Sequence, residues 1–340
     1  MREKPNLEGN QIIACLRDQY GVSAVSIEFL PIGYDSYAAT YRVIAQDDRH
    51  YFLKVRLDGV YAPSVTIPHY LLEQGIEQVV APIPTTTGDL WATLDSFSLI
   101  LYPFIDGQEG MEIGLSDRQW TEFGAALRKL HAIRLPSDLA DQVRKEDFVP
   151  NPKWSAVAKR LHAEVPQREY TNPYQNVLAV FWRERHDEIG RLVDRAEELG
   201  RLLQGHSLDF VLCHADIHTA NLLITPEDRL FIVDWDQPIL APKERDLMFV
   251  LGAVGGDART PRQEDLFFQG YGGVQIDALA MAYYRYEWVV QEIGAWGEDV
   301  FLRDDVGDET RQDSAKHFRY LFEPGDVVEA AYQSEGRLSG

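Results

Sequence analysis

The segment 211–236, VLCHADIHTANLLITPEDRLFIVDWD, constrains the fold of this chain more than any other stretch. It holds His214, Asp216 and Asn221 in the spacing H-x-D-x-x-x-x-N, and Asp234 follows a short apolar run. Two carboxylates and one side-chain amide at this spacing match a known sequence motif. The chain must therefore adopt a fold that brings these side chains to one place.

The residues around these side chains predict a β-hairpin. Apolar residues 222–224 and 230–233 are typical of two strands, and residues 225–228, Thr-Pro-Glu-Asp, are typical of a turn. Asp216 then lies at the mouth of the hairpin and Asp234 just past its second strand, so both carboxylates can reach one phosphate group. The alternative is a polar turn between two core strands, with Asp216 and Asn221 capping the backbone.

Phosphoryl transfer needs these residue types in this order. One carboxylate accepts a proton from a hydroxyl, while an amide oxygen and a second carboxylate hold the magnesium that clamps ATP. The spacing of Asp216 and Asn221 is that of the protein-kinase catalytic loop. Asp216 is therefore a candidate catalytic base, and Asn221 and Asp234 are candidate ligands of Mg²⁺.

Composition limits the partners of the chain. Its 340 residues favour about two domains. The formal net charge of −21 repels phosphate backbones, which argues against a nucleic-acid partner. The same charge attracts a cationic small molecule, although an acidic surface also simply keeps a protein soluble. We expect a monomer or a weak homodimer.

The cellular location follows from what the sequence lacks. Two cysteines suit a reducing cytoplasm and do not make a disulfide framework. A charged-then-apolar leader is not evident, and apolar runs stay short of the ~20 residues that span a bilayer. We expect a cytoplasmic protein without membrane contact.

The order of elements predicts an α+β, bilobal protein-kinase-like fold. Strands and helices favour an antiparallel-sheet N-terminal lobe over residues 1–104, which binds the nucleotide. A mostly helical lobe over residues 105–340 then carries catalysis and substrate binding. The expected strands are 25–30, 38–45, 50–56, 90–93 and 98–102, and the expected helices are 9–20 and 64–73, one capped by Ser116, one from Trp154, one over 181–203 and one over 279–293.

Nucleotide binding also requires a cation and a loop over the phosphates. Lys54 stands among apolar residues of the third expected strand, where an interior lysine needs an anion. The alternative is a lysine on the exposed face of an edge strand. Residues 31–36 occupy the place of the phosphate loop with one glycine only, and Ser36 could donate a hydrogen bond to a phosphate.

The chain resembles the aminoglycoside phosphotransferase family, a branch of the protein-kinase-like fold. The resemblance rests on residues 213–218 with Asn221, on residues 232–236 and on Lys54. It implies ATP- and Mg²⁺-dependent phosphorylation of a hydroxyl on an aminocyclitol or aminoglycoside antibiotic, which confers resistance. The resemblance also implies that Lys54 contacts the ATP phosphates. It implies that Pro103 and Ile105 supply the backbone groups that face adenine.

Two features depart from the family pattern. Kinases pair the phosphate-binding lysine with a glutamate on the following helix. Residues 60–70 contain neither Glu nor Asp, and Glu73 is the nearest candidate. Either Lys54 is held differently, or ATP binding orders it. Pro103 is also unusual in the linker because it removes a backbone donor.

A cationic acceptor needs carboxylates and aromatic faces. Asp236 is the first candidate because it lies two residues from the metal-binding carboxylate, and Glu287 is the second. Trp235 and Tyr271 are candidate aromatic contacts. For each, the alternative is an internal ion pair or a core ring.

Rival functions remain open. The same reaction could act on choline, a sugar, homoserine or a macrolide. The chain could also be a pseudokinase that binds nucleotide as a scaffold. Such a scaffold would be expected to lose one of Lys54, Asp216, Asn221 or Asp234, and all four are present.

Overall fold

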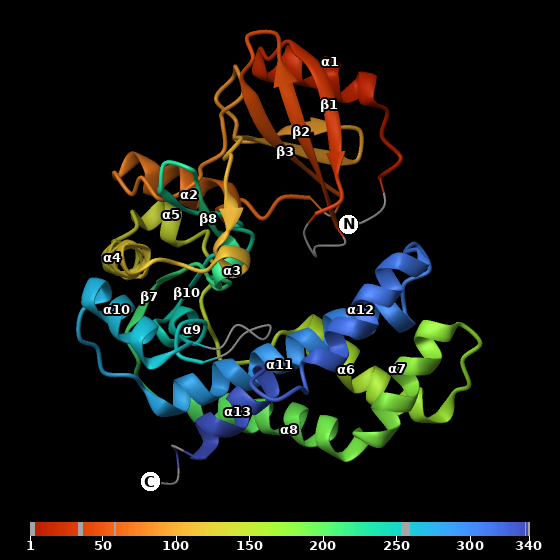
Figure 1. Cartoon of the computed structure of the whole chain (residues 1–340). Helices are drawn as coiled ribbons and strands as arrows, with labels where there is room; N and C mark the ends of the chain where they lie inside the picture. The colour runs from red at the N-terminus through yellow and green to blue at the C-terminus, as the bar shows by residue number, and fades with distance from the viewer. Residues whose placement is uncertain (1–3, 33–36, 58, 253–258, 337, 339–340) are drawn as a thin grey trace. The chain divides into compact units, whose positions relative to one another are not determined.

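The computed structural model describes residues 4–32, 37–57, 59–252, 259–336 and 338 (Figure 1). The chain divides into two compact units. The first unit holds Met1–Arg144 and His214–Pro238, and the second holds Lys145–Cys213 and Ile239–Gly340. The lobe boundary expected between residues 104 and 105 stays a prediction.

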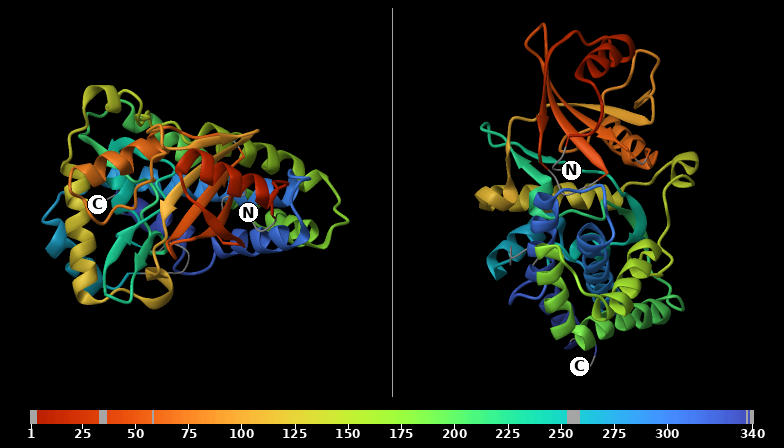
Figure 2. Two further views of the ribbon diagram at one scale, coloured as in Figure 1. Left: turned by 90° about the horizontal axis from the view of Figure 1, so that it is seen from above. Right: turned by 90° about the vertical axis from the view of Figure 1, so that its right-hand side faces the viewer.

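A five-stranded antiparallel sheet forms the core of the first unit (Figures 1 and 2). Its strand order is β1-β2-β3-β5-β4. The strands are β1 (Ala24–Leu30), β2 (Ala38–Ala45), β3 (His50–Arg56), β4 (Ala92–Leu94) and β5 (Phe97–Pro103). Helix α1 (Gly9–Tyr20) has the bounds that the sequence predicts, and β4 begins two residues later than expected.

The two faces of this sheet carry different side chains, because side chains alternate along a strand. Residues such as Tyr41, Leu53 and Leu101 are buried in one cluster with residues of α1. Figure 2 shows α1 lying on this face. The next residues along the same strands, including Lys54, point to the opposite face. Since β3 is the middle strand of the five, Lys54 is not on an edge strand, and only 8% of it is exposed.

The remaining helices of the first unit frame the hairpin. They are α2 (Pro63–Glu73), α3 (Gly110–Ile113), α4 (Asp117–Ala132) and α5 (Ser137–Ala140). Ser116 and Gln119 form the capping box that the sequence predicts at the start of α4. The residue after the cap of α2, Gly75, has a φ of 81°, which glycine adopts readily.

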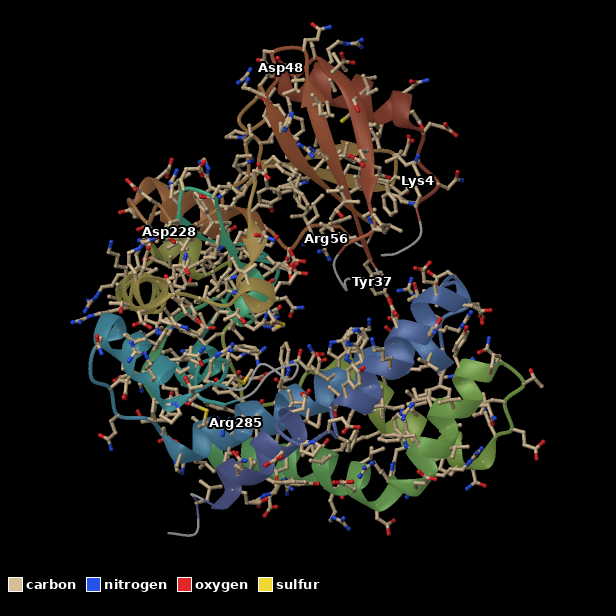
Figure 3. The ribbon with its side chains drawn as sticks, viewed as in Figure 1. Lys4, Tyr37, Asp48, Arg56, Asp228 and Arg285 are labelled. Atoms are coloured by element: carbon tan, nitrogen blue, oxygen red, sulfur yellow. The ribbon has the colours of Figure 1, made fainter. Side chains whose placement is uncertain are left out.

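The predicted hairpin is present and is held on three sides. It consists of η2 (Thr219–Asn221), β8 (Leu222–Ile224) and β9 (Leu230–Ile232), and β6 (Gln108–Glu109) pairs with β8. The backbone of Ile232 exchanges hydrogen bonds with Gln78 and Val80. At the turn, Asp228, which is labelled in Figure 3, accepts hydrogen bonds from Arg118 and Gln119 of α4. The mouth of the hairpin therefore has a defined position in this unit.

The second unit is mostly helical. Helix α11 (Ala278–Phe301) lies at its centre and contacts helices from both parts of the unit, namely α6 (Pro152–Glu164), α8 (His186–Leu203), α12 (Asp308–Tyr320) and α13 (Val327–Gly336). The other elements are α7 (Pro173–Glu184), α9 (Glu244–Leu247), α10 (Pro261–Tyr271), η1 (Val165–Gln167), β7 (Phe210–Cys213) and β10 (Ile239–Pro242). Among the described residues, no helix is long and apolar enough to cross a membrane.

The expectation of one helix over residues 181–203 is wrong. Helix α7 ends at Glu184, and α8 begins at His186. Arg185 between them has φ −111° and ψ 16°, outside helical geometry. Its guanidinium lies over the rings of Phe181 and Phe322 and pairs with Glu188, so tertiary contacts stabilise the break. Neither glycine nor proline marks this break in the sequence.

Gly110 offers a test of how tightly the hairpin is held. A Cβ atom there would lie 2.9 Å from Leu115 Cδ2 and 3.0 Å from the carbonyl oxygen of Thr219. Gly110→Ala should therefore lower the free energy of unfolding by about 1–3 kcal/mol. It should also lower kcat, because Thr219 lies in the short helix that ends at Asn221. Thermal unfolding and steady-state kinetics measure the two effects.

Gly205→Ala is the matched control, since its Cβ would meet only the carbonyl oxygen of Leu202 at 3.9 Å. Unchanged kinetics in Gly110→Ala would show that the catalytic loop tolerates this displacement.

Candidate functional site

His214 fastens the two ends of the hairpin to each other. Its Nε2 atom lies 2.9 Å from the carbonyl oxygen of Val233, and its Nδ1 atom lies 3.3 Å from the backbone nitrogen of Asp216. Because the amide of Asp216 can only donate, Nδ1 accepts and Nε2 donates, which is the neutral tautomer. The ring also meets the edge of the Trp235 ring, with centroids 4.5 Å apart. One side chain thus links the start of the loop to the end of the second strand.

The backbone on both sides of this link is unusual. Ala215 has φ 73° and Asp234 has φ 61°, in the left-handed region that costs most residues about 1–2 kcal/mol. Ala215 lies between His214 and Asp216, whose amide His214 contacts. Asp234 follows Val233, whose carbonyl oxygen His214 contacts. One strained residue, Asp234, carries a carboxylate itself, and the other, Ala215, directly precedes the carboxylate of Asp216.

Asn221 and Asp216 are in direct contact. The Nδ2 atom of Asn221 donates to the backbone carbonyl of Asp216 at 2.7 Å and to its Oδ2 atom at 3.2 Å. The amide oxygen of Asn221 consequently faces away from Asp216. The Nε2 atom of His218 lies 3.3 Å from Oδ1 of Asp216. The carboxylate is thus oriented from both sides, while 35% of its side chain stays exposed.

Lys54 lies between two carboxylates from the end of the hairpin. Its Nζ atom is 2.9 Å from Oδ1 of Asp234 and 2.7 Å from both oxygens of Asp236. Arg56, on the same face of β3, donates from Nη1 to Oδ2 of Asp236 at 2.9 Å. Burial raises the pKa of the Asp236 carboxyl, and the charge of Lys54 opposes this.

These contacts resolve the question of the missing glutamate. The contacts described for Lys54 are with carboxylates that follow β9. Glu73, the nearest candidate in the sequence, pairs instead with His69 at 3.5 Å, and 63% of its side chain is exposed. Lys54 is therefore held differently from the kinase pattern, without any bound nucleotide.

A pocket lies on this face of the sheet, within the first unit. Its lining combines apolar side chains with the charged side chains of Lys54, Asp234 and Asp236. Burial raises the pKa of the Tyr102 hydroxyl in this wall. The lining residues are Ile32, Ala38, Thr40, Phe52, Lys54, Val80, Tyr102, Pro103, Phe104, Ile105, Glu109, Ala220, Asn221, Leu223, Val233, Asp234, Trp235 and Asp236.

The linker residues Pro103 and Ile105 both line this pocket. Between them, the backbone nitrogen of Phe104 donates to the carbonyl oxygen of His50 at 3.3 Å. Backbone groups alternate sides along an extended strand, so the carbonyl group of Pro103 points away from β3. The donor that proline lacks is thus not one that the β3–β5 pairing uses at this position.

The other predicted site residues are placed as follows. Ser36 lies outside the described residues. Trp235 is buried, and its Nε1 atom donates to the carbonyl oxygen of Ile232 at 3.3 Å. Glu287 and Tyr271 belong to the second unit, where Glu287 pairs with Arg245 at 3.3 Å and Tyr271 stacks on a neighbouring phenylalanine. Substrate contacts by these residues stay predictions.

Three further residues belong to this site and were not predicted from the sequence. Arg56 reaches Asp236, His218 reaches Asp216, and Glu109 lines the pocket, where burial raises the pKa of its carboxyl. Strand alternation could have identified Arg56, since it lies two residues after Lys54 on a predicted strand. Nothing in the sequence near Glu109 distinguishes it from other exposed acids.

A fold with this hairpin and this pocket is that of a kinase-like phosphotransferase, and comparisons with known proteins agree. The model of the phosphotransferase enzyme family matches residues 26–284. The chain belongs to this family, which confirms the predicted resemblance, the bilobal α+β fold and the enzyme class. At 340 residues, most of the chain lies within the match.

Three individual proteins are similar to this chain to different degrees. The crystal structure of spectinomycin phosphotransferase APH(9)-Ia with ADP and spectinomycin is 32% identical, covers 97% of this chain and 99% of its own, and has a TM-score of 0.87. Protein StrN of Streptomyces griseus is 28% identical over 71% of this chain and 74% of its own length. Choline kinase LicA from Streptococcus pneumoniae shares the fold at 15% identity, 91% and 98% coverage and a TM-score of 0.53.

The role of His214 can be tested directly. His214→Ala removes the acceptor for the Asp216 amide and the donor to Val233. We expect kcat to fall about tenfold or more, since each unmade buried hydrogen bond costs about 1–3 kcal/mol. The affinity for nucleotide should change little, because the ring does not line the pocket.

Steady-state kinetics and nucleotide titration measure the two quantities, and His206→Ala, an exposed histidine of the second unit, is the control. Equal losses in kcat and nucleotide affinity would contradict a role confined to the loop.

Proposed function

We propose that this enzyme transfers the γ-phosphoryl group of ATP to the 9-hydroxyl of spectinomycin and thereby confers resistance. The observation that carries the proposal is the convergence of Lys54, Asn221 and Asp234 at one pocket of the first unit, with Asp216 in hydrogen-bond contact with Asn221. The similarity to spectinomycin phosphotransferase over 97% of the chain supports the choice of acceptor. So do the stretches 102–105, 234–238, 241–249, 270–272 and 283–287, which resemble that enzyme.

The apolar part of the pocket suits adenine. Pro103 and Ile105 would offer a backbone acceptor and a backbone donor to the edge of the base, and Ile32 and Phe52 would lie against its faces. Lys54 would contact the phosphates from the other end of the pocket. Ser36, which precedes β2 in the sequence, is proposed to donate a hydrogen bond to a phosphate.

The chemistry of two side chains fits Mg²⁺. This ion prefers oxygen ligands, and the amide oxygen of Asn221 and the carboxylate of Asp234 are such ligands. Asn221 turns its nitrogen to Asp216, so its oxygen is on the side away from the base. Lys54 contacts Oδ1 of Asp234, which leaves Oδ2 for a cation. When bound, Mg²⁺ would neutralise charge on the phosphates.

Asp216 would act as the catalytic base. Its carboxylate accepts the proton of the acceptor hydroxyl as the oxygen attacks the γ-phosphorus. Asn221 and His218 hold the carboxylate by contacts at 3.2 and 3.3 Å. Lys54 stabilises negative charge on the transferred group.

The acceptor is a small cation with two amines, and the net charge of −21 favours its approach. Asp236 and Glu287 are the carboxylates we propose to bind its amines, with Trp235 and Tyr271 as aromatic contacts. Each of the two carboxylates also has an internal cationic partner. An amine must therefore compete with that partner.

Asp216→Asn tests the base. The substitution keeps the shape of the side chain but removes the proton acceptor, so kcat should fall about 10²–10⁴-fold. Binding of Mg-ATP should stay within a few-fold, because Asp216 does not line the nucleotide pocket. Coupled ADP release and calorimetric titration measure these two quantities. Near-normal turnover in a folded variant would remove Asp216 from its assigned role.

The acceptor itself is tested with a panel of alcohols in the coupled ADP assay. Spectinomycin should give a higher kcat/KM than choline, a hexose, homoserine or a macrolide, and phosphorus NMR of the product should show one ester at the 9-position. Turnover of choline without turnover of spectinomycin would sink the substrate assignment and leave the reaction class intact. ATP binding without ADP release from any acceptor would favour a scaffold.

A further inference from the structure

Two cations share one carboxylate at the end of β9. Both oxygens of Asp236 lie 2.7 Å from Nζ of Lys54, and Oδ2 lies 2.9 Å from Nη1 of Arg56. Figure 3 labels Arg56 near the end of β3. Its side chain is 15% exposed and that of Lys54 is 11% exposed, so neither charge is well screened by water.

The present contacts of Lys54 conflict with its proposed role. A lysine that contacts the phosphates of ATP must give up some of its bonds to Asp234 and Asp236. Asp234 would be compensated, because it becomes a ligand of Mg²⁺. Asp236 has no such compensation, and a partly buried carboxylate that loses its partner is costly.

Arg56 is placed to supply that compensation. It also donates from Nε to the backbone carbonyl of Gly59 at 3.0 Å, which holds the guanidinium beside Asp236. Lys54 lines the nucleotide pocket, whereas Arg56 is not among the described residues that do so. Nucleotide binding therefore requires Lys54 to change partners, while the ion pair between Arg56 and Asp236 stays in place.

We propose that Arg56 is a positioning residue for phosphoryl transfer: it serves as the standing counter-ion of Asp236 and so allows Lys54 to leave this carboxylate for the ATP phosphates. The inference rests on the proposed function, because it assumes that Lys54 binds the phosphates. It assigns Arg56 no contact with nucleotide or acceptor. Asp236 is the partner of Lys54 in the absence of nucleotide. When nucleotide binds, Lys54 exchanges Asp236 for the ATP phosphates.

The experiment compares the affinities of ATP and AMP in the presence of Mg²⁺ by calorimetric titration. In Arg56→Met, Lys54 is the remaining cation on Asp236, so ATP affinity should fall roughly tenfold or more. AMP lacks the phosphates that Lys54 would bind, and its affinity should stay within twofold. Arg56→Lys keeps the charge and should recover most of the loss.

A second substitution separates a counter-ion from a general effect of charge. Arg56→Met combined with Asp236→Asn removes the carboxylate that needs compensation, and ATP affinity should return towards that of the parent enzyme. Arg56→Met combined with Glu109→Gln also removes one negative charge from the lining of the same pocket. It should restore little, because Glu109 is not a partner of Arg56 in the described contacts.

Equal loss of ATP and AMP affinity in Arg56→Met would overturn the proposal, since that is the result of structural damage. Equal recovery by the two second substitutions would also overturn it. Lys54→Met distinguishes failure of the proposed function from failure of this inference. Unchanged ATP affinity in Lys54→Met removes the phosphate role of Lys54 itself. Loss in Lys54→Met without loss in Arg56→Met removes only the role of Arg56.

Discussion

The structure depends on one ion pair between residues that are 180 positions apart, Lys54 and Asp234. It joins the middle strand of the sheet to the end of the β8–β9 hairpin. Strand alternation sends Lys54 to the face opposite α1, and the hairpin delivers two carboxylates to that face. Because the cost of burying an unpaired charge is high, each partner stabilises the position of the other. The pocket is the space that this arrangement leaves beside the linker.

The backbone is strained at both ends of the hairpin. The backbone has positive φ values at Ala215, which precedes Asp216, and at Asp234. Such conformations persist only where neighbouring contacts determine them. His214 provides these contacts through its two ring nitrogens. A buried histidine thus acts here as a mechanical link, and its neutral tautomer follows from the two groups that it joins.

The sequence predicted what is encoded locally. The hairpin, the bounds of α1, β2 and β3, and the capping box at Ser116 follow from patterns of a few residues, and all are present. The partners of Lys54 were missed, because pairing between residues so distant in sequence leaves no local pattern. The break at Arg185 was missed for the same reason, since rings from another helix stabilise it. The family motif located the carboxylates, and only the fold showed which cations they meet.

The missing glutamate has a consequence for how the site handles charge. In the kinase arrangement a glutamate outside the metal site holds the lysine throughout. Here the lysine is held by Asp234, a candidate metal ligand, and by Asp236. In the proposed function, nucleotide and Mg²⁺ would compete for the two ends of the Lys54–Asp234 ion pair. An amine of the proposed acceptor would reach Asp236 only when one of the two cations gives up an oxygen. If Lys54 is the cation that moves, nucleotide binding would precede amine binding at Asp236, and the order of binding would follow from the exchange of partners.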